Sequence, residues 1–445
     1  MRQLRISLVV FLGFVAFAPT LRLGFQFDDH DYIESNLSLR HWDIPALKHD
    51  FLPGTRGPQE FYYRPLQSLL NRLLYSAWGL NPFGYHLTNL ILHIGNAVLV
   101  MELLLALSLS PWAAVATGSL FAVHPIIVSE LMMVSGIPEI MSFFFSLLCL
   151  LLLLKKEGFT TPLAALSYAL ALLSKESALG VPFYFALLDG FQSGNPRRMR
   201  QWMMLLLLTA VYLAWRTFAL GMPNVSLSVN ALPAFFFGRL PVILYRYAGL
   251  VLFPWNLHAY RLIPYINPLW AYGTAGLLIW GYAAGGKASW ARFCAAWGLI
   301  SFLPKIPLLA TGHYMLEHWA YPALPAILLL LSLAFTRGWL SGKTAWRWTA
   351  TAAFSLLLCF YIFSAQFHTA VRATDEKNYR WSLRFTRATP VLFNLGLLCL
   401  RTGRAAEAVQ YIEPVHVLYP EDQNITRALA AAESRAGRKA DAGHI

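Results

Sequence analysis

Charged side chains are scarce in this sequence, since Asp, Glu, Lys and Arg make up only 13% of its 445 residues. Soluble domains carry about 25% charged residues, so the deficit argues against a soluble protein. Cysteine is also scarce, at four residues, and Cys149, Cys294 and Cys359 lie inside apolar runs. We interpret them as small buried hydrophobes, and neither a disulfide framework nor a cysteine metal site is expected.

Apolar residues are abundant instead, at 57% of the chain, with 15% aromatic. Several runs approach the roughly 20 residues that a helix needs to cross a bilayer. The clearest are Leu87–Leu107, Met141–Leu154, Met203–Leu220 and Leu324–Phe335. Backbone exposed to lipid must be hydrogen-bonded internally, so this pattern predicts an all-α, polytopic membrane helical bundle.

The net charge of +13 does not indicate nucleic-acid binding, because Lys and Arg cluster in short segments between the apolar runs. Such clusters mark the cytoplasmic side of a membrane protein. With Arg2 and Arg5 inside, on an uncleaved first span, Asp28 emerges outside. The basic stretch Asn195–Arg200 then lies inside, and the pattern predicts about eleven spans with an external C-terminus.

Three segments need a separate interpretation. Residues 24–84 are polar, rich in Pro and aromatics, and predict a large external loop. The run Ala234–Trp255 carries two arginines, which are costly at bilayer depth, so we expect a re-entrant or interfacial element there. The membrane domain is predicted to span residues 1–366, followed by a connector over 367–388.

Residues 389–445 have the composition of a small soluble helical domain. The stretch from Phe393 to Tyr411 has small residues at positions typical of helix crossings, and Ala428–Gly437 begins a second partial copy. This pattern resembles a tetratricopeptide repeat of about one and a half units, with an unrelated helical hairpin as the alternative. Such solenoids need about three repeats for stability, so the domain is expected to dock on the membrane part.

Polar residues that could perform chemistry gather outside. Asp28 and Asp29 follow the first span beside aromatic residues, where one carboxylate could act as a general base. Arg64 follows Tyr63 before the second span. That span carries a polar stripe on one helix face, formed by His86, Asn89, His93 and Asn96. For the stripe, substrate contact and hydrogen bonding between helices both remain open.

Lys175 and Glu176 are expected at the outer end of the fifth span, where the lysine needs an anion as partner. Further external groups are His124, Glu130, Glu139, His258, Arg261, Lys305, His313, Glu317 and His318. No His-x-x-x-His or Asp-x-Asp arrangement gives a strong metal site, and a divalent-metal requirement stays open. Carboxylates and cations on one outer face suit group transfer from a phosphate-bearing lipid: a base takes the acceptor proton while cations stabilise the leaving phosphate.

At this point a set of motifs resembles a known family. The motifs are Phe27-Asp28-Asp29, Tyr63-Arg64-Pro65-Leu66, the block Trp78–His93, Leu120–Pro125, Ser174-Lys175-Glu176, Leu252–Trp255, and Glu317 with Tyr321-Pro322. Together they resemble the GT-C superfamily of glycosyltransferases, and above all the transmembrane and tetratricopeptide-containing O-mannosyltransferases. The motifs occur in the family's order across nearly the whole membrane part.

The resemblance implies inverting transfer of one sugar, with mannose as the candidate, from a polyprenyl- or dolichyl-phosphate donor to a hydroxyl, often on Ser or Thr. It maps the catalytic base onto Asp28 or Asp29, and the donor-phosphate contacts onto Arg64 and Lys175. The remaining candidates are expected to contact substrate: Tyr63, His86, His93, His124, Glu130, Glu176, Arg261, Glu317 and His318. The chain departs from the family after His124-Pro125, where Ser129 precedes Glu130 and Ile137 stands at the family's arginine.

Three other functions remain as alternatives. A related transferase could modify a glycolipid or polysaccharide, as the lipid A aminoarabinose transferase does. A transporter or flippase for lipid-linked sugars would show internal repeats and broken helices at the midplane, and we find no such duplication. A scaffold without catalysis would leave Asp28, Arg64 and Lys175 unexplained. Short external loops favour a bacterial inner membrane with the site on the periplasmic side.

Overall fold

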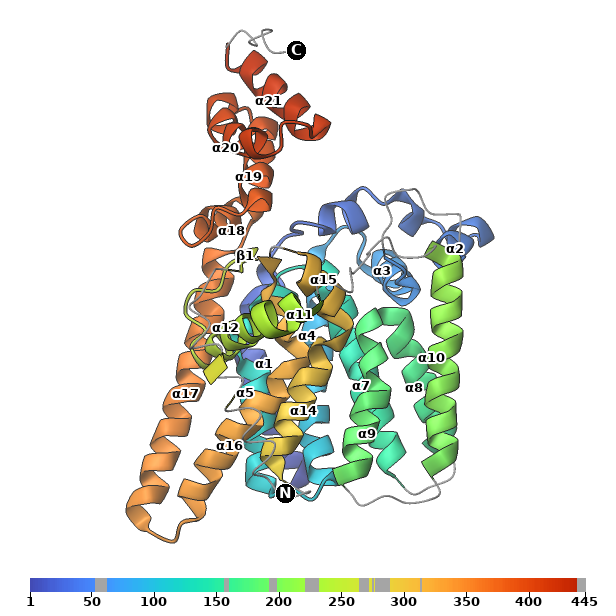
Figure 1. Ribbon diagram of the computed structural model, residues 1–445, viewed down its shortest axis with the longest axis vertical. Coiled ribbons are helices and arrows are strands. Elements are labelled where there is room, and N and C mark those ends of the chain that lie inside the picture. The colour runs from blue at the N-terminus through green and yellow to red at the C-terminus, as the bar shows by residue number, and fades with distance from the viewer. Residues whose placement is uncertain are drawn as a thin grey trace.

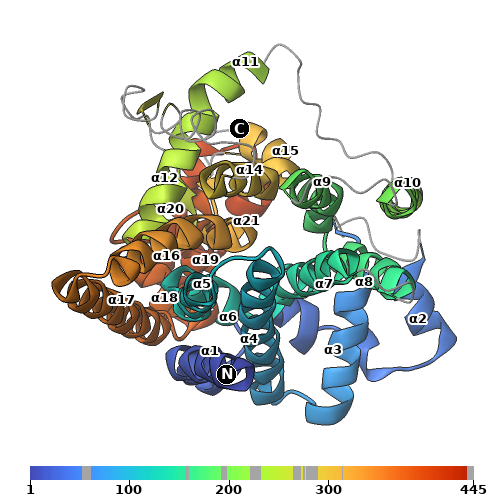
Figure 2. The ribbon, with the colours of Figure 1, turned by 90° about the horizontal axis from the view of Figure 1, so that it is seen from below.

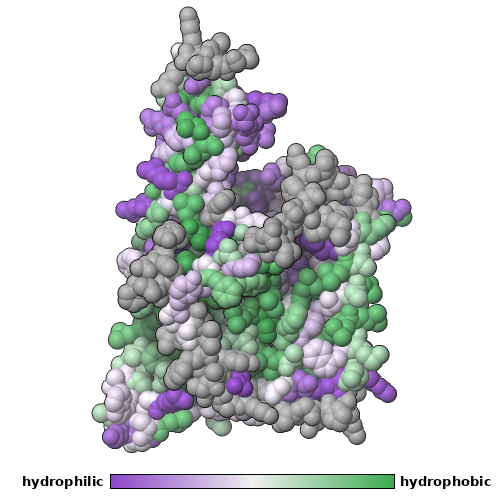
Figure 3. Space-filling model, in the orientation of Figure 1, coloured by the Kyte–Doolittle hydropathy of each residue, from purple (hydrophilic) through white to green (hydrophobic). Residues whose placement is uncertain are grey.

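The computed structural model describes residues 1–52, 62–155, 160–191, 198–220, 232–263, 272–273, 276, 289–312 and 314–437. Within these ranges the protein is a helical bundle with a small helical lobe at one end (Figure 1). The N-terminus lies at the end opposite to this lobe. Apolar side chains cover the middle of the bundle, and hydrophilic ones gather on the lobe and at the far end (Figure 3).

The described residues contain seven helical segments that are long and apolar enough to cross a membrane. They are Arg2–Arg22, Pro82–Ala106, Val134–Leu154, Leu232–Leu252, Trp290–Thr311, Glu317–Leu340 and Thr344–Val371. An eighth forms if Pro111–Val123 and Pro125–Leu131 are one span bent by 41°. The break falls at Pro125, which has no N–H to continue the helix. The chain is therefore a multi-pass membrane protein, whereas the number of eleven spans stays a prediction.

The bundle is built from helices that are separated by short 3-10 and π-helical turns. The first half contains α1 (Arg2–Phe17), η1 (Ala18–Arg22), α2 (Ile44–Phe51), α3 (Pro65–Trp78), α4 (Pro82–Ala106), α5 (Pro111–Val123), α6 (Val128–Leu131), η5 (Val134–Gly136), α7 (Ile137–Leu154), α8 (Thr160–Ser174), η6 (Glu176–Gly180) and α9 (Val181–Phe191). The second half contains α10 (Met199–Leu220), α11 (Leu232–Ala234), η9 (Phe235–Arg239), α12 (Leu240–Leu252), α14 (Trp290–Phe302), η10 (Leu303–Lys305), α15 (Ile306–Thr311), η11 (Glu317–Ala323), α16 (Leu324–Leu340) and α17 (Thr344–Val371). Two short strands, β1 (Arg261–Leu262) and β2 (Tyr314–Met315), pair antiparallel.

Two predicted segments differ in detail from the structure. The expected external loop over 24–84 contains the helices α2 and α3, because Asp43 and Pro65 start them with a side-chain cap and a proline at the first position. Helix α17 continues to Val371, past the predicted boundary at 366. The segment α11–α12 lies across the long axis of the bundle (Figures 1 and 2), the orientation of an interfacial helix.

The C-terminal lobe consists of α19 (Thr389–Arg401), α20 (Ala405–Leu418) and α21 (Gln423–Arg435). Helices α19 and α20 form a hairpin, and Gly403 allows the turn with a φ of +79°, which other residues rarely adopt. Gly396 lets the two helices approach closely, since a Cβ there would lie 2.5 Å from Ile412 Cγ1. The tetratricopeptide assignment of this lobe stays a prediction. Helix α18 (Asp375–Ser382) connects the lobe to the bundle, inside the predicted connector.

Candidate functional site

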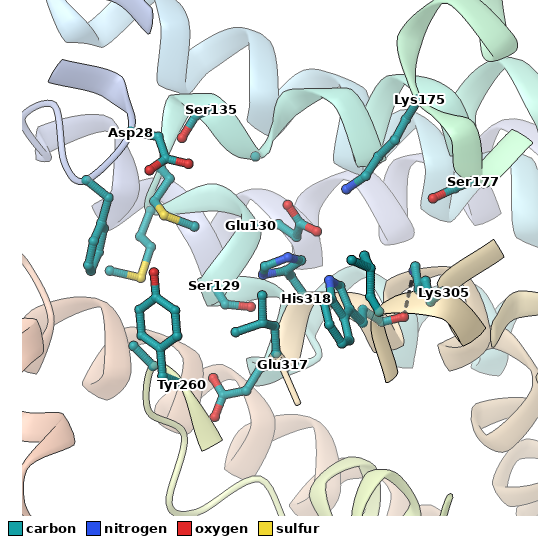
Figure 4. Close-up of a pocket in the computed structure, with 18 of the residues that line it drawn as sticks. Asp28, Ser129, Glu130, Ser135, Lys175, Ser177, Tyr260, Lys305, Glu317 and His318 are labelled. Carbon is teal, nitrogen blue, oxygen red and sulfur yellow. Dashed lines mark hydrogen bonds between the residues drawn. The ribbon is translucent and has the colours of Figure 1, made fainter. Parts of the chain in front are cut away.

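A cavity of about 370 Å³ opens among residues from distant parts of the chain. The segment after α1, the turns η5, η6 and η11, and helices α6 and α18 all contribute to its wall. Its charged and titratable lining residues are Asp28, Arg64, Glu130, Lys175, Glu176, His258, Lys305, Glu317, His318 and Arg372. Asp28 and Lys175 lie on opposite sides of it, with Glu130 and His318 between them (Figure 4).

The polar stripe of α4 forms hydrogen bonds to elements that surround this cavity. His93 and Asn96 each hydrogen-bond the Tyr321 hydroxyl, at 2.9 and 3.0 Å, and so fix η11. Asn96 also donates to the carbonyl of Ile140 on α7. These side chains are buried away from the cavity, so hydrogen bonding between helices accounts for them.

The same holds for His86 and His124, two further histidines that the sequence offered as substrate contacts. His86 hydrogen-bonds the carbonyls of Leu131 and Gly24, and His124 bonds that of Val251. Like His93, both are completely buried and neither lines the cavity. The structure therefore places these three histidines away from the cavity, where backbone groups and the Tyr321 hydroxyl bind their ring nitrogens, and their contact with substrate stays a prediction.

The adjacent carboxylates Asp28 and Asp29 have different surroundings. Asp29 is 0% exposed, and its oxygens accept the backbone N–H groups of Gln26, Val134 and Ser135 at 2.7 to 3.0 Å. Asp28 lines the cavity, and within the described part of the chain no hydrogen bond or ion pair of its carboxylate is found. Partial enclosure raises the pKa of Asp28, as do the charges of Asp29 and Asp31, and Arg64 opposes them.

A buried carboxylate with two lysines forms the opposite wall. Glu139 Oε2 lies 2.7 Å from Lys175 Nζ, and its Oε1 lies 3.2 Å from Lys305 Nζ. Glu139 is 1% exposed, and Ser177 donates a further hydrogen bond to it. Two cations on one anion leave a net charge of +1, and both lysines line the cavity. The anion that Lys175 was expected to need is thus Glu139.

Glu176 pairs instead with Arg64, at 3.4 Å, and the Arg64 guanidinium lies 4.2 Å from the centre of the Tyr62 ring. Burial opposes ionisation of Glu176, but Arg64 and Lys175 hold its pKa below the usual value. Tyr63, predicted as a substrate contact, is buried, and its hydroxyl bonds Phe51 and Trp215 outside the cavity lining. The substrate contact of Tyr63 stays a prediction, whereas its neighbour Tyr62 lines the cavity.

A second buried carboxylate, Glu317, binds two arginines. Its Oε1 lies 3.1 Å from Arg261 Nη2 and its Oε2 lies 3.3 Å from Arg372 Nη1. The backbone N–H of His258 donates to it as well, at 2.6 Å. Arg261 does not line the cavity itself. It is linked to the cavity through its ion pair with Glu317, which does.

Glu130 and His318 line the cavity, as the sequence predicted. The Oε1 atom of Glu130 is buried and has no hydrogen-bond partner among the described residues. Gly136 lies close to the Glu130 side chain: a Cβ at this position would come within 2.7 Å of Glu130 Oε2. A buried oxygen without a partner is expensive and is typical of a site that binds a ligand.

Sequence reasoning gave no role to Glu139 and Lys305, and it did not find Arg372 and Asn378. Arg372 could have been found as a charge directly after a long apolar run. The contact between Arg372 and Asn378 needs the turn from α17 into α18, which the composition does not reveal. His313, also named from the sequence, lies outside the described residues. Among the described residues no group of three or more His, Cys, Asp or Glu could hold a metal ion.

Comparison with known proteins confirms the resemblance expected from the motifs. The chain is 32% identical to the protein O-mannosyl-transferase TMTC3 of Homo sapiens over 188 residues, which are 40% of this chain and 20% of that protein. It is 37% identical to the protein O-mannosyl-transferase Tmtc2 of Drosophila melanogaster over 121 residues, covering 26% and 13%. The chain therefore matches only a small part of these relatives. No family model matches it.

The solved structure of the Archaeoglobus fulgidus oligosaccharyltransferase, tethered to an acceptor peptide, aligns with a TM-score of 0.45 at 14% identity. The alignment covers 85% of this chain and 55% of that one. A likeness at this level supports no conclusion on function.

Proposed function

We propose that this multi-pass membrane protein is a glycosyltransferase of the GT-C type. It transfers one sugar from a polyprenyl-phosphate-linked donor to a hydroxyl of a protein acceptor, on Ser or Thr, with inversion. The observation that carries the proposal is one cavity lined by Arg64, by the carboxylate of Asp28 on one side and by Lys175 and Lys305 on the other. The two relatives reported above are both named protein O-mannosyl-transferases, which supports this reaction and mannose as the sugar.

Each charged group has a defined task in this reaction. The acceptor hydroxyl loses its proton to Asp28 while its oxygen bonds to the anomeric carbon. The bond between that carbon and the phosphate oxygen breaks, and the phosphate leaves with the electron pair. Attack from the face opposite to the leaving group inverts the anomeric configuration. A general base of this kind contributes roughly 10²–10⁴-fold in rate.

The cationic wall matches the charge that develops on the donor. A polyprenyl-phosphate sugar is a phosphodiester with one negative charge, and the leaving polyprenyl phosphate carries up to two. In this proposal the triad of Glu139, Lys175 and Lys305, with its formal net charge of +1, offsets the second charge on the leaving phosphate. Fixed charges aimed at a developing anion stabilise the transition state more than the ground state.

The reaction can be tested with the purified full-length chain in proteoliposomes. Polyprenyl phosphate carrying ¹⁴C-mannose is supplied together with a mixture of envelope proteins and, separately, an envelope glycolipid extract. We expect label on protein that alkaline β-elimination releases, and no label from a nucleotide-linked mannose. Lys175→Ala should reduce the transfer, whereas Lys343→Ala, an exposed lysine at the other end of the bundle, should not.

Each other outcome identifies a different function. Label on the glycolipid instead of protein would replace the acceptor proposed here and support the glycolipid transferase. Donor that crosses the bilayer without being consumed would overturn the enzyme assignment in favour of a transporter.

A further inference from the structure

The segment that carries Asp28 is held by helix α18. Asp375, the first residue of α18, binds both sides of this segment: its Oδ1 accepts the N–H of Phe27 at 3.0 Å, and its Oδ2 lies 2.9 Å from His30 Nε2. The Phe27 ring meets the Tyr379 ring edge-on at 5.1 Å. Gln26 donates to the carbonyl of Ala373, just before α18.

These contacts stabilise an unfavourable backbone conformation. Phe27 has a φ of +53°, which costs a residue with a Cβ roughly 1–3 kcal/mol. Such a conformation persists only where several contacts determine it together. Asp29 fixes the segment from the other side, through η5. Between these anchors the side chain of Asp28 is directed into the cavity, and among the described residues its carboxylate has no hydrogen-bond partner.

Helix α18 is in turn tied to the C-terminal lobe by ion pairs. Arg404 on the lobe binds Glu376 at 2.6 and 2.9 Å, and Arg380 binds both Glu376 and Glu407. Glu376 and Asp375 are neighbours in sequence but differ in partners, since Glu376 contacts the lobe and Asp375 contacts the segment of Asp28. A continuous set of contacts thus links the lobe to the carboxylate.

We propose that Asp375 is a positioning residue for Asp28, and that α18 with the C-terminal lobe is part of the catalytic unit. This rests on the proposed function, because Asp375 itself touches no substrate. A base displaced by about 1 Å can lose 10²-fold in rate. Loss of Asp375 therefore lowers turnover, while donor binding through Arg64, Lys175 and Lys305 is unchanged.

Asp375→Ala and Asp375→Asn test this inference, with Lys377→Gln, at an exposed position of the same helix, as the matched control. For Asp375→Ala we expect turnover to fall at least about 10-fold at an unchanged donor KM, with a smaller loss for Asp375→Asn. Hydrogen exchange gives a readout without activity: the Phe27 amide should exchange at least about 10-fold faster in Asp375→Ala and be unchanged in Lys377→Gln.

The two readouts separate the two proposals. Absence of transfer by the wild-type chain would contradict the function but leave the exchange result standing. Unchanged exchange at Phe27 would overturn the positioning role whatever the activity. The positioning role would also be overturned if turnover stayed normal despite faster exchange, or if the donor KM rose while turnover did not fall.

An independent observation concerns a second, smaller cavity of about 270 Å³ behind the Glu317 cluster. Arg246, Arg261, Asn256, His258, Leu262, Phe385 and Thr386 line it. Arg246 stands on α12 in a segment apolar enough to span a membrane, and no hydrogen bond or ion pair of its side chain is found among the described residues. The Nε atoms of Arg246 and Arg261 are buried without a partner.

Positively charged side chains outnumber negatively charged ones around this second cavity. Arg261 and Arg372 both bind the one carboxylate of Glu317, and Arg246 lines the same cavity as Arg261. Residues 263–289, which follow β1, contain no Asp or Glu. An unpaired arginine at a membrane boundary is costly and needs an anion. Guanidinium groups match the geometry of phosphate oxygens, and apolar Leu262 and Phe385 line the same cavity.

We infer that this second cavity binds a phosphate group, held by Arg246 and by the free Nε of Arg261. The source is either a bilayer lipid, whose chains would lie along α12, or a free phosphate. Native mass spectrometry of the full chain in detergent distinguishes them with phosphatidylglycerol, inorganic phosphate and diacylglycerol as probes. Arg246→Ala and Arg246→Lys are the variants, and Arg347→Ala, an exposed arginine at the opposite end, is the control.

We expect Arg246→Ala to bind phosphatidylglycerol at least about 10-fold more weakly than the wild type, since charge-assisted hydrogen bonds contribute about 1.5–3 kcal/mol. Arg246→Lys should retain part of the affinity, Arg347→Ala all of it, and diacylglycerol should not compete. Competition by inorganic phosphate would identify a free-phosphate site, and its failure a lipid site. Equal binding by Arg246→Ala and Arg347→Ala, or competition by diacylglycerol, would overturn the inference.

Discussion

Asp28 and Asp29 are neighbours in sequence, yet Asp28 lines the cavity while Asp29 is fully buried and accepts three backbone N–H groups. The difference arises because Asp29 closes the turn to Gln26 and binds the start of η5, which leaves the preceding side chain directed toward the cavity. The sequence offered both carboxylates as the base. The geometry favours Asp28 for chemistry and Asp29 for structure.

Asp29→Asn should therefore destabilise the protein. An amide has one acceptor oxygen where the carboxylate uses two, so at least one buried N–H loses its partner, at a cost of about 1–3 kcal/mol. We expect a lower apparent Tm in detergent, measured by tryptophan fluorescence. Asp31→Asn, beside it, is the control and should leave the Tm unchanged. An unaltered Tm in Asp29→Asn would contradict the structural role.

The pH dependence of transfer follows from the surroundings of Asp28. Its pKa lies above the usual value, mainly through enclosure and then through Asp29 and Asp31. A base must be deprotonated, so activity should fall as pH decreases through this raised pKa. Because Arg64 lowers the pKa, Arg64→Gln should move the acidic limb of kcat/KM to higher pH, and Asp31→Asn should move it to lower pH. Shifts in the reverse directions would exclude Asp28 as the titrating group.

Glu139 should be essential for stability, because this buried carboxylate binds both the buried Lys305 and the partly buried Lys175. Removal of one partner of a buried ion pair costs about 3–5 kcal/mol. Glu139→Gln should therefore lower the apparent Tm strongly. Glu102→Gln, which breaks a pair with the 74% exposed Arg2, should cost less than about 1 kcal/mol. Equal losses in the two variants would show that the triad is not buried as described.

Topology can be checked with reporter fusions. The basic clusters place Asn195 inside and the C-terminal lobe outside, and the N-terminus and the lobe lie at opposite ends of the bundle (Figure 1). A fusion after Thr389 should be active outside and one at Asn195 active inside. Activity of both on the same side would move the cavity to the other face of the membrane.

Much of this arrangement was open to prediction, because local patterns determine it. The apolar runs predicted the bundle, and the motifs predicted that Asp28, Arg64, Lys175, Glu176, Glu317 and His318 belong together. The position of His86, His93 and His124 outside the cavity lining could not be predicted, since a sequence cannot show whether a polar side chain in a span meets a cavity or a backbone carbonyl. The pairing of Lys175 with Glu139 depends on how α7 packs against η6, which no local pattern encodes.

The rate of sugar transfer by Asp28→Asn tests the central claim most directly. The substitution keeps the shape of the side chain but removes its basicity, and with no hydrogen bond to lose it should fold and insert normally. With wild-type donor KM and Tm, transfer should fall at least about 10²-fold. Near wild-type transfer by Asp28→Asn at matched protein levels would contradict the assignment of Asp28 as the base, and with it the catalytic role of this cavity.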